Sequence, residues 1–549
     1  MAARAGGVCW IGLFCAVSLP FAAHAALAAQ VGRGQDHAPG QVLVRLRERL
    51  SDEARRRVWA AHGLNHIVSL PALGVDLLAS PNRPSDGVPA ELAASPAVEW
   101  AEPNYLCRPA LAEPNDPAYH EMIAGLWVQW PAHQLDMMAA WDTYPADYLT
   151  ASNRPQTAPI VAIVDTGVDP GHPDFMNVGA TGTDVAQGGQ LLLSQACTFL
   201  SGQSNDLAPE ATDEHGHGTY LAGLVAAAAN NGITAGDGIA GIAYTARLLP
   251  LKVARANGVA THADVARAIT YAADHGAMVI LIGMEAETWS QTLQSAVDYA
   301  WNRGCFLAAP AGNTGDSTPI FPASCPHVFG VAAATADGRV AAYSTRGRAA
   351  LAGPGGDETI GIYSTLPTYA CTLRSDLTTP AYGWLMGTSQ AAAHVAGAAA
   401  LRAGSVGLAP ATGDEGGLIW RALQQSATAL TDTALGGWEE TAGYGLLAPA
   451  TLLTGEGRRA ASVGGMVGRV LSAGSPVIGA PVTATPEGPG QPVTVTTEWP
   501  AGGYRMANVA PGRYQVTAEA GGNTGVWERA NVRAGCDAPE VDFRLGSLS

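Results

Sequence analysis

The sequence predicts an α/β fold in which helices flank a parallel sheet, with a small α/β unit before it and a β-sandwich after it. From residue 159 to residue 333, short apolar runs alternate with alanine-rich helical patterns, and runs that are apolar on both faces are typical of buried parallel strands. The regions before residue 110 and after residue 456 have patterns of their own. With 549 residues, the chain also exceeds what a single hydrophobic core supports.

The first residues have the three parts of a secretory signal peptide. Arg4 is followed by an apolar run from Val8 to Phe21 and then by small residues at 23–28. An apolar run of about 14 residues is too short to span a bilayer, which needs roughly 20. We therefore expect residues 1–28 to be removed. The mature protein is then secreted, as an extracellular, periplasmic or cell-surface protein without a membrane span.

Residues 29–112 are expected to form a small α/β domain. An alternating run at Gln41–Leu46, a charged helical stretch after it and an extended run at Val98–Tyr105 predict its main elements. Pro109 and Pro114 interrupt regular structure beyond this domain. They indicate an exposed connection that a protease can cut.

Two further domains follow, at residues 113–455 and 456–549. In the first, the alternating pattern predicts a helix-wrapped sheet with strands at 160–164, 248–253, 277–282, 305–309 and 328–333. In the second, period-two runs at 481–485, 493–497 and 514–518 are separated by turn signals. This pattern is typical of a small β-sandwich.

The formal net charge of the chain is −17 at pH 7. Nucleic acids and anionic membranes carry the same sign of charge and would be repelled. We therefore expect neither as a partner.

The first motif with chemical potential is Asp165-Thr166-Gly167, directly after the apolar run 160–164. A carboxylate at the carboxyl end of a strand lies where open α/β sheets place their sites. A turn-forming aspartate is the simpler interpretation. Half of an aspartic protease is another, but that enzyme needs two such carboxylates, and the sequence holds no second Asp-Thr-Gly or Asp-Ser-Gly.

The second motif, His215-Gly216-His217-Gly218-Thr219, opens an alanine-rich helical pattern. A histidine at a helix start can face a site while the helix packs beneath it. Most single histidines are merely structural. A metal site with Asp213 is another interpretation, but no further His or Cys cluster has suitable spacing.

The third motif, Gly387-Thr388-Ser389-Gln390-Ala391, places a serine between a glycine turn and a long helical pattern. A lone serine at this position is most often a helix cap. The motif also approaches the Gly-x-Ser-x-Gly elbow of α/β-hydrolases, in which the acid and the histidine follow the serine. Here the order is Asp, His, Ser.

In this order the three motifs resemble those of the subtilisin-type serine proteases (peptidase family S8), over about residues 115–453. The resemblance implies a subtilisin-like fold with Asp165, His217 and Ser389 as the catalytic triad. Asn313 matches the side chain of the family's oxyanion hole. The implied protein is a serine endopeptidase that hydrolyses the peptide bonds of proteins through an acyl-enzyme and requires no cofactor for catalysis.

The resemblance also implies substrate-binding residues, namely Gly283, Met284, Glu285, Ala311 and Gly312. Several positions depart from the family pattern: Gly283 and Glu285 stand where serine and glycine are usual, Tyr220 replaces a histidine, and Ile320 reduces the space of the pocket. Glu285 is expected to attract a basic side chain, to narrow the cleft, or only to be a solvated glutamate.

Three further features come from the same resemblance. The family often binds calcium, and Asp174 matches a ligand position, so that a structural calcium is an open expectation. Residues 29–112 resemble the family's inhibitory propeptides, which implies a zymogen whose own propeptide is an inhibitory partner. Residues 466–545 resemble the carboxypeptidase-regulatory or transthyretin-like β-sandwich.

Two alternatives remain open at this point. Instead of a protease, the chain could be a catalytically silent binding protein on the same fold. It could also be an acyl transferase that joins or cyclises peptides when an amine intercepts the acyl-enzyme. Product analysis separates both from a protease.

Eight cysteines are present, of which Cys9 and Cys15 belong to the signal peptide and Cys107 to the propeptide. Export makes disulfides possible for the other five, and an odd number leaves at least one thiol unpaired within the chain. Cys325 and Cys371 lie in predicted loops near the motifs, and we expect a bridge between them.

Overall fold

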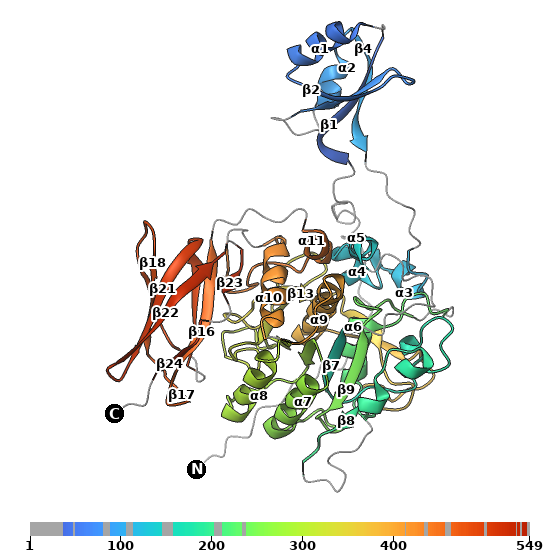
Figure 1. Cartoon of the computed structure of the whole chain (residues 1–549). Coiled ribbons are helices and arrows are strands. Elements are labelled where there is room, and N and C mark those ends of the chain that lie inside the picture. Colours follow the sequence, from blue (N-terminus) through green and yellow to red (C-terminus); the bar gives the residue numbers. More distant parts are fainter. Residues whose placement is uncertain are drawn as a thin grey trace. The chain divides into compact units, whose positions relative to one another are not determined.

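The computed structural model of the chain (Figure 1) describes residues 37–47, 50–80, 88–105, 113–144, 158–201, 211–232, 238–411, 413–432, 437–455, 463–498, 502–533, 535–538 and 541–545. The chain divides into two compact units, Met1–Leu111 and Ala112–Ser549. The expected signal peptide lies outside the described residues. Within the described part, no helix is both long enough and apolar enough to cross a membrane.

The N-terminal unit is an antiparallel sheet of order β2-β3-β1-β4 accompanied by two helices. Its core includes Val42, Val44, Trp59 and Leu78, because alternate residues of the strands turn towards the helices. Ser51 Oγ accepts the N–H of Ala54 and caps the first helix. The elements are β1 (His37–Leu46), α1 (Asp52–Ala61), β2 (Asn65–Leu70), β3 (Val75–Ala79), α2 (Val88–Ala93) and β4 (Val98–Tyr105).

A parallel seven-stranded sheet of order β13-β12-β11-β10-β7-β9-β8 forms the centre of the second unit. All side chains of β7, β10, β11 and β12 are buried, as the predicted apolar runs require. The strands are β7 (Ile160–Asp165), β8 (Cys197–Thr198), β9 (Arg247–Lys252), β10 (Val279–Ile282), β11 (Phe306–Pro310), β12 (Phe329–Ala334) and β13 (Leu351–Pro354).

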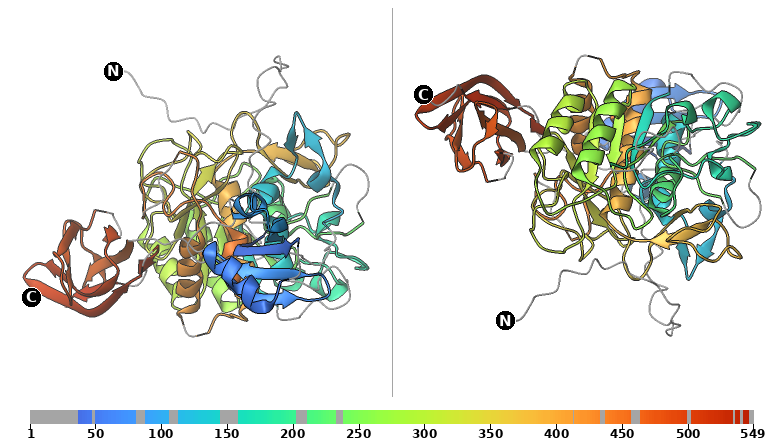
Figure 2. Two further views of the ribbon diagram at one scale, coloured as in Figure 1. Left: turned by 90° about the horizontal axis from the view of Figure 1, so that it is seen from above. Right: turned by 90° about the horizontal axis from the view of Figure 1, so that it is seen from below.

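Five longer helices cover this sheet: α6 (His217–Ala226), α7 (His262–Asp274), α8 (Gln291–Trp301), α9 (Thr388–Ser405) and α10 (Glu415–Ser426). Figure 1 and the right view of Figure 2 show α7 and α8 side by side, and α6 packs against α9. Side-chain hydroxyls cap the N-termini of α7 and α8. Thr261 Oγ1 accepts the N–H of Asp264, and Ser290 Oγ accepts the N–H of Leu293.

Shorter elements connect these layers. The hairpins β5–β6 and β14–β15 are each antiparallel. The shorter elements are α3 (Pro117–His120), β5 (Met122–Ile123), β6 (Leu126–Trp127), α4 (Trp130–Gln134), α5 (Met137–Thr143), η1 (Pro173–Phe175), η2 (Val185–Gln187), η3 (Leu193–Gln195), β14 (Ile362–Thr365), β15 (Tyr382–Leu385) and α11 (Pro449–Thr454).

The C-terminal region of the second unit is built from two sheets that enclose a core of their own, as the period-two runs predict; their pairs are antiparallel except those of β16 with β23 and β24, which are parallel. One sheet has the order β17-β16-β20, with β23 and β24 also paired to β16, and the other has the order β19-β18-β21-β22. The strands are β16 (Gly464–Ser472), β17 (Ser475–Pro476), β18 (Pro481–Pro486), β19 (Val493–Thr496), β20 (Gly503–Val509), β21 (Gly512–Ala520), β22 (Asn523–Val532), β23 (Asp537–Ala538) and β24 (Phe543–Leu545).

The expected bridge between Cys325 and Cys371 is wrong. No disulfide joins them, and among the described residues none of the cysteines at 197, 305, 325, 371 and 536 forms one. Cys325 is buried near the charges of Asp298 and Arg469, whereas Cys371 lies where a side chain on Gly216 would meet its sulfur. The two loops therefore hold their cysteines in different surroundings.

Candidate active site

The carboxyl edge of the parallel sheet gathers the residues that the motifs single out. Asp165 ends β7 and is fully buried. Gly283 follows β10, and Asn313 follows β11 on the next strand. His217 is the first residue of α6 and Ser389 the second residue of α9. Because parallel strands end at one edge, residues far apart in the sequence share one region.

Asp165 and His217 form the central pair of the site. Nδ1 of His217 lies 2.9 Å from both carboxylate oxygens of Asp165. Burial lowers the pKa of His217, but the charge of Asp165 and its hydrogen bond outweigh this effect, so that the pKa is raised overall. Among the described residues, Nε2 has no hydrogen-bond partner. This nitrogen is therefore available to accept a proton.

Two glycines let other segments approach Asp165. A Cβ atom on Gly283 would lie 1.8 Å from Asp165 Oδ2, and one on Gly218 would lie 3.1 Å from Asp165 Cβ. The neighbouring Thr166 donates its backbone N–H to Asp165 Oδ1 at 2.7 Å. The departure at Gly283 thus has a local explanation, since the carboxylate occupies the space that a side chain would need.

Asp213 fixes the start of the histidine helix. Its buried carboxylate accepts the N–H groups of His215, Gly216 and Thr219 at 2.7–3.1 Å. It also accepts the hydroxyl of Thr166, beside Asp165, at 2.7 Å. The sequence motif indicates Asp213 only as a metal ligand and does not reveal this role. Its place two residues before His215 was the available signal.

Ser389 lies half-buried in the first turn of α9, next to Thr388, which forms two hydrogen bonds with Asn313. The N–H of Thr388 donates to Asn313 Oδ1 at 2.9 Å, and the Thr388 hydroxyl does so at 3.1 Å. Because Oδ1 accepts from a backbone N–H, the assignment of the amide is unambiguous. The donor end, Nδ2, is thus left for another acceptor. The family resemblance indicates Asn313 but not its two hydrogen bonds with Thr388.

The residues implied to bind substrate lie after β10 and β11. Met284 is half-buried and Glu285 is exposed, whereas Ala311 and Gly312 are buried. A Cβ on Gly312 would lie 2.4 Å from Ile320 Cγ1, so that Ile320 occupies the space beside this glycine. The pKa of Glu285 is raised by partial loss of solvent around its carboxylate, although the charge of His217 lowers it.

Tyr220 lies one turn after His217, at a position where the family usually has a histidine. Its side chain connects two distant segments of the chain. Its buried hydroxyl donates to the carbonyl of Ile362 and accepts the N–H of Leu385 at 3.1 Å. Ile362 and Leu385 are paired across β14 and β15. The phenol therefore links the histidine helix to the hairpin that leads to Ser389, a contact between distant segments that no local pattern predicts.

Asp174 and Asp116 are the groups in the described part that best fit a metal. Burial raises the pKa of Asp174 to about 7 and that of Asp116 to about 6. Asn231 Nδ2 and the N–H of Ile239 donate to Asp174, whereas Oδ1 of Asp116 is buried without a partner in the described part. Two buried carboxylates that repel each other fit a hard cation such as Ca²⁺. The described residues hold no cluster of three such ligands.

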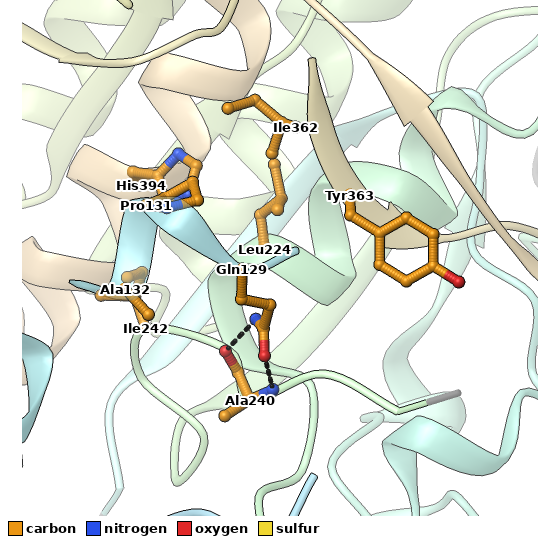
Figure 3. Close-up of a pocket in the computed structure, with 9 residues that line it drawn as sticks. All are labelled: Gln129, Pro131, Ala132, Leu224, Ala240, Ile242, Ile362, Tyr363 and His394. Atoms are coloured by element: carbon orange, nitrogen blue, oxygen red, sulfur yellow. Dashed lines mark hydrogen bonds between the residues drawn. The ribbon is translucent and has the colours of Figure 1, made fainter. Parts of the chain in front are cut away.

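A small pocket is lined by side chains from α4, α6, α9 and β14 and from neighbouring loops (Figure 3). Gln129 spans it, donating to the carbonyl of Ala240 at 3.1 Å and accepting the N–H of the same residue at 3.0 Å. Burial lowers the pKa of the His394 imidazole to about 4, so that this ring is neutral. None of Asp165, His217 or Ser389 lines the pocket, and it is therefore separate from the candidate active site.

A carboxylate-bound histidine, a serine at a helix start and an oriented amide at one sheet edge are the parts of a serine protease. The chain belongs to the subtilase family, which its residues 156–445 match. Residues 23–104 match the fervidolysin N-terminal prodomain, and residues 465–546 match the carboxypeptidase regulatory-like domain. The protein is thus a subtilase-family serine endopeptidase with a prodomain.

Relatives agree with this assignment. The chain is 32% identical over 365 residues to the thermophilic serine proteinase of Bacillus sp. (strain AK1), covering 66% of this chain and 78% of that protein. It is 34% identical over 291 residues to thermitase of Thermoactinomyces vulgaris, covering 53% and 85%.

A solved structure has the same fold. Fervidolysin of Fervidobacterium pennivorans has a TM-score of 0.50 and 23% identity, with 93% of this chain and 79% of that chain covered. At this identity the comparison concerns the fold alone.

Proposed function

We propose that the protein is a secreted endopeptidase that cleaves proteins through an acyl-enzyme, with Asp165, His217 and Ser389 as its triad. The observation that carries the proposal is the imidazole of His217, which is bound to Asp165 through Nδ1, while Nε2 has no hydrogen-bond partner in the described part of the chain. Such a ring is held in the tautomer that a general base needs. The position of Ser389 in the first turn of α9 supports its role as the nucleophile.

The reaction follows from these groups. Oγ of Ser389 attacks the scissile carbonyl carbon, and its proton passes to Nε2 of His217, whose charge Asp165 stabilises. Nδ2 of Asn313 and the N–H of Ser389 donate hydrogen bonds to the oxyanion. His217 then protonates the leaving amine, which departs from the acyl-enzyme. A water molecule then gives a proton to His217 and attacks the ester carbonyl carbon, and His217 returns that proton to Oγ of Ser389 as the ester bond breaks.

Protein or peptide substrates contact the segments after β10 and β11. We assign this role to Gly283, Met284 and Glu285 on one side and to Ala311 and Gly312 on the other. Backbone groups at the open edges of such segments can pair with an extended peptide. The prodomain inhibits the enzyme until it is cut near residue 112, after export removes residues 1–28.

Calcium is proposed as a structural ion bound by Asp116 and Asp174. Asp116 and Asp174 would hold this ion, which would supply positive charge to two buried carboxylates and would take no part in catalysis. The unpartnered Oδ1 of Asp116 supports this site. Removing calcium with a chelator is expected to lower the unfolding temperature of the wild type, and Asp174→Asn is expected to abolish that difference.

Mass spectrometry of purified wild-type and Ser389→Ala precursors tests the central proposal. Each is incubated alone and then with denatured casein. The proposal expects the wild type to cut itself near residue 112 and to cut casein, while the variant does neither. If folded wild type cuts nothing, the chain is a silent binding protein. If longer or cyclic products dominate, it is an acyl transferase.

A further inference from the structure

The β-sandwich contacts the catalytic region through two sets of polar side chains, and the first surrounds Arg469 of β16. Its side chain is 4% exposed, and Nη1 lies 2.6 Å from Asp298 Oδ2 on α8. Nε donates to Asp542 Oδ2 of the sandwich at 3.0 Å. His327 closes the set, with Nδ1 3.2 Å from Asp298 Oδ1 and Nε2 3.4 Å from Asp542 Oδ2. Its ring stacks on Trp301.

The second set surrounds Asp537 of β23, whose side chain is fully buried. The carboxylate accepts Tyr444 Oη at 3.0 Å and Gln424 Nε2 at 3.0 Å, both from the catalytic region. Its backbone N–H donates to Gln424 Oε1 at 2.8 Å, so that one amide holds the strand twice. Arg505 Nη1 lies 2.6 Å from the same carboxylate, and its guanidinium lies over the Trp438 ring.

These contacts differ from those of a loosely tethered module. Tethered domains usually meet through small interfaces and move relative to one another. Here Arg469 and Asp537 are withdrawn from water, which is costly unless each keeps its partners. Both find partners on the catalytic side, in Asp298 and in Gln424 with Tyr444. Val467 of the sandwich also packs into the apolar core of the catalytic region.

From this geometry we infer that the β-sandwich is a permanently docked clamp on α8, α10 and the 438–444 segment, and that its role is to stabilise the enzyme. We call the catalytic side of this contact (Asp298, His327, Gln424, Trp438 and Tyr444) the docking face. The surface of the sandwich that covers the docking face is already occupied and is not open to substrate. The inference does not depend on the catalytic mechanism proposed above.

A chain cut between the two domains tests the inference. In the Ser389→Ala background, which prevents self-digestion, the recognition site of a sequence-specific protease replaces part of the segment between Gly455 and Val463. After cutting, the two pieces are expected to co-elute in size-exclusion chromatography at about 0.15 M salt. They are also expected to unfold in one calorimetric transition. Separate elution of the pieces would overturn the inference without bearing on catalysis.

Arg469→Ala sharpens this test, with Arg544→Ala as a matched control because Arg544 is exposed on β24 of the same domain. Removing one partner of a buried ion pair is strongly destabilising, and we expect the unfolding temperature to fall by about 5 °C or more. The cut pieces of Arg469→Ala should also separate more readily than those of the control. Equal behaviour of the two variants would contradict the clamp. If Arg469→Ala does not fold, Asp542→Asn replaces it in the same comparison.

Discussion

Two histidines of this protein, His217 and His327, each lie next to aspartate carboxylates, but their surroundings suit them to different roles. His217 binds Asp165 through Nδ1 alone and keeps Nε2 free among the described residues. His327 has Asp298 near one ring nitrogen and Asp542 near the other, and its ring stacks on Trp301. A histidine–aspartate contact is therefore not by itself catalytic.

The difference lies in what the second nitrogen can reach. A general base must accept a proton at one nitrogen while the other fixes the tautomer. His217 meets that condition at the edge of the sheet, where substrate can approach. His327 has both nitrogens engaged and only 7% of its side chain exposed, and its contacts hold two domains together instead.

Replacing each histidine by alanine gives the largest expected difference. His217→Ala should lower kcat by about 10⁶-fold, a figure taken from subtilisin, a relative of this protein. His327→Ala should keep kcat near the wild-type value but lower the unfolding temperature, because it leaves two carboxylates around Arg469 without one partner. Casein hydrolysis and calorimetry measure the two effects. A large loss of kcat in folded His327→Ala would break the comparison.

Asn313→Ala is expected to have the next largest effect. The variant loses an oriented donor to the oxyanion, and kcat should fall by about 10²–10³-fold with little change in KM, again by analogy with subtilisin. Asn302→Ala serves as the control, since Asn302 is exposed at the end of α8. Steady-state kinetics on a peptide substrate measures kcat and KM of both variants. An effect confined to KM would assign Asn313 to substrate binding instead.

Gly283→Ala tests whether the position of the Asp165 carboxylate matters. Its new Cβ would lie 1.8 Å from Asp165 Oδ2, so that the carboxylate must leave its present position beside His217. Misplacement of about 1 Å can cost about 10²-fold in rate, and we expect a loss of that order in kcat. Gly171→Ala is the matched control, because its Cβ would have only an ordinary contact. Unchanged kcat in Gly283→Ala would show that the pair tolerates displacement.

Glu285→Gln should produce the smallest effect, in the pH profile. The negative charge of Glu285 helps to raise the pKa of His217. A base must be neutral to act, so activity falls as pH drops through that pKa, and the raised pKa places the acid limb at higher pH. Removing the charge should shift the acid limb of kcat/KM to lower pH, whereas Glu287→Gln should shift it less. An unmoved limb would contradict the electrostatic coupling.

Local patterns in the sequence predicted the elements that place the site. The apolar run 160–164 became β7, and the motifs at His217 and Ser389 begin helices. These features depend on neighbouring residues and on a fixed spacing. The parallel sheet then brings the motifs to one edge without further information.

Contacts between distant segments were beyond such patterns. Tyr220 binds Ile362 and Leu385, and the hydrogen bonds from Thr388 to Asn313 join the start of α9 to the segment after β11. Proximity to the motifs in the sequence also suggested a Cys325–Cys371 bridge, but neither thiol forms a disulfide. Burial and long-range packing decide these cases, and a single sequence does not encode them in a readable spacing.

The central claim is that Ser389 is the nucleophile activated by the free nitrogen of His217. The most direct measurement treats the mature enzyme with a fluorophosphonate, in which a serine oxygen displaces fluoride from phosphorus, and maps the adduct by mass spectrometry. We expect one adduct, on Ser389, in the wild type and none in folded His217→Ala. No adduct in the wild type, or an adduct on another serine, would contradict it.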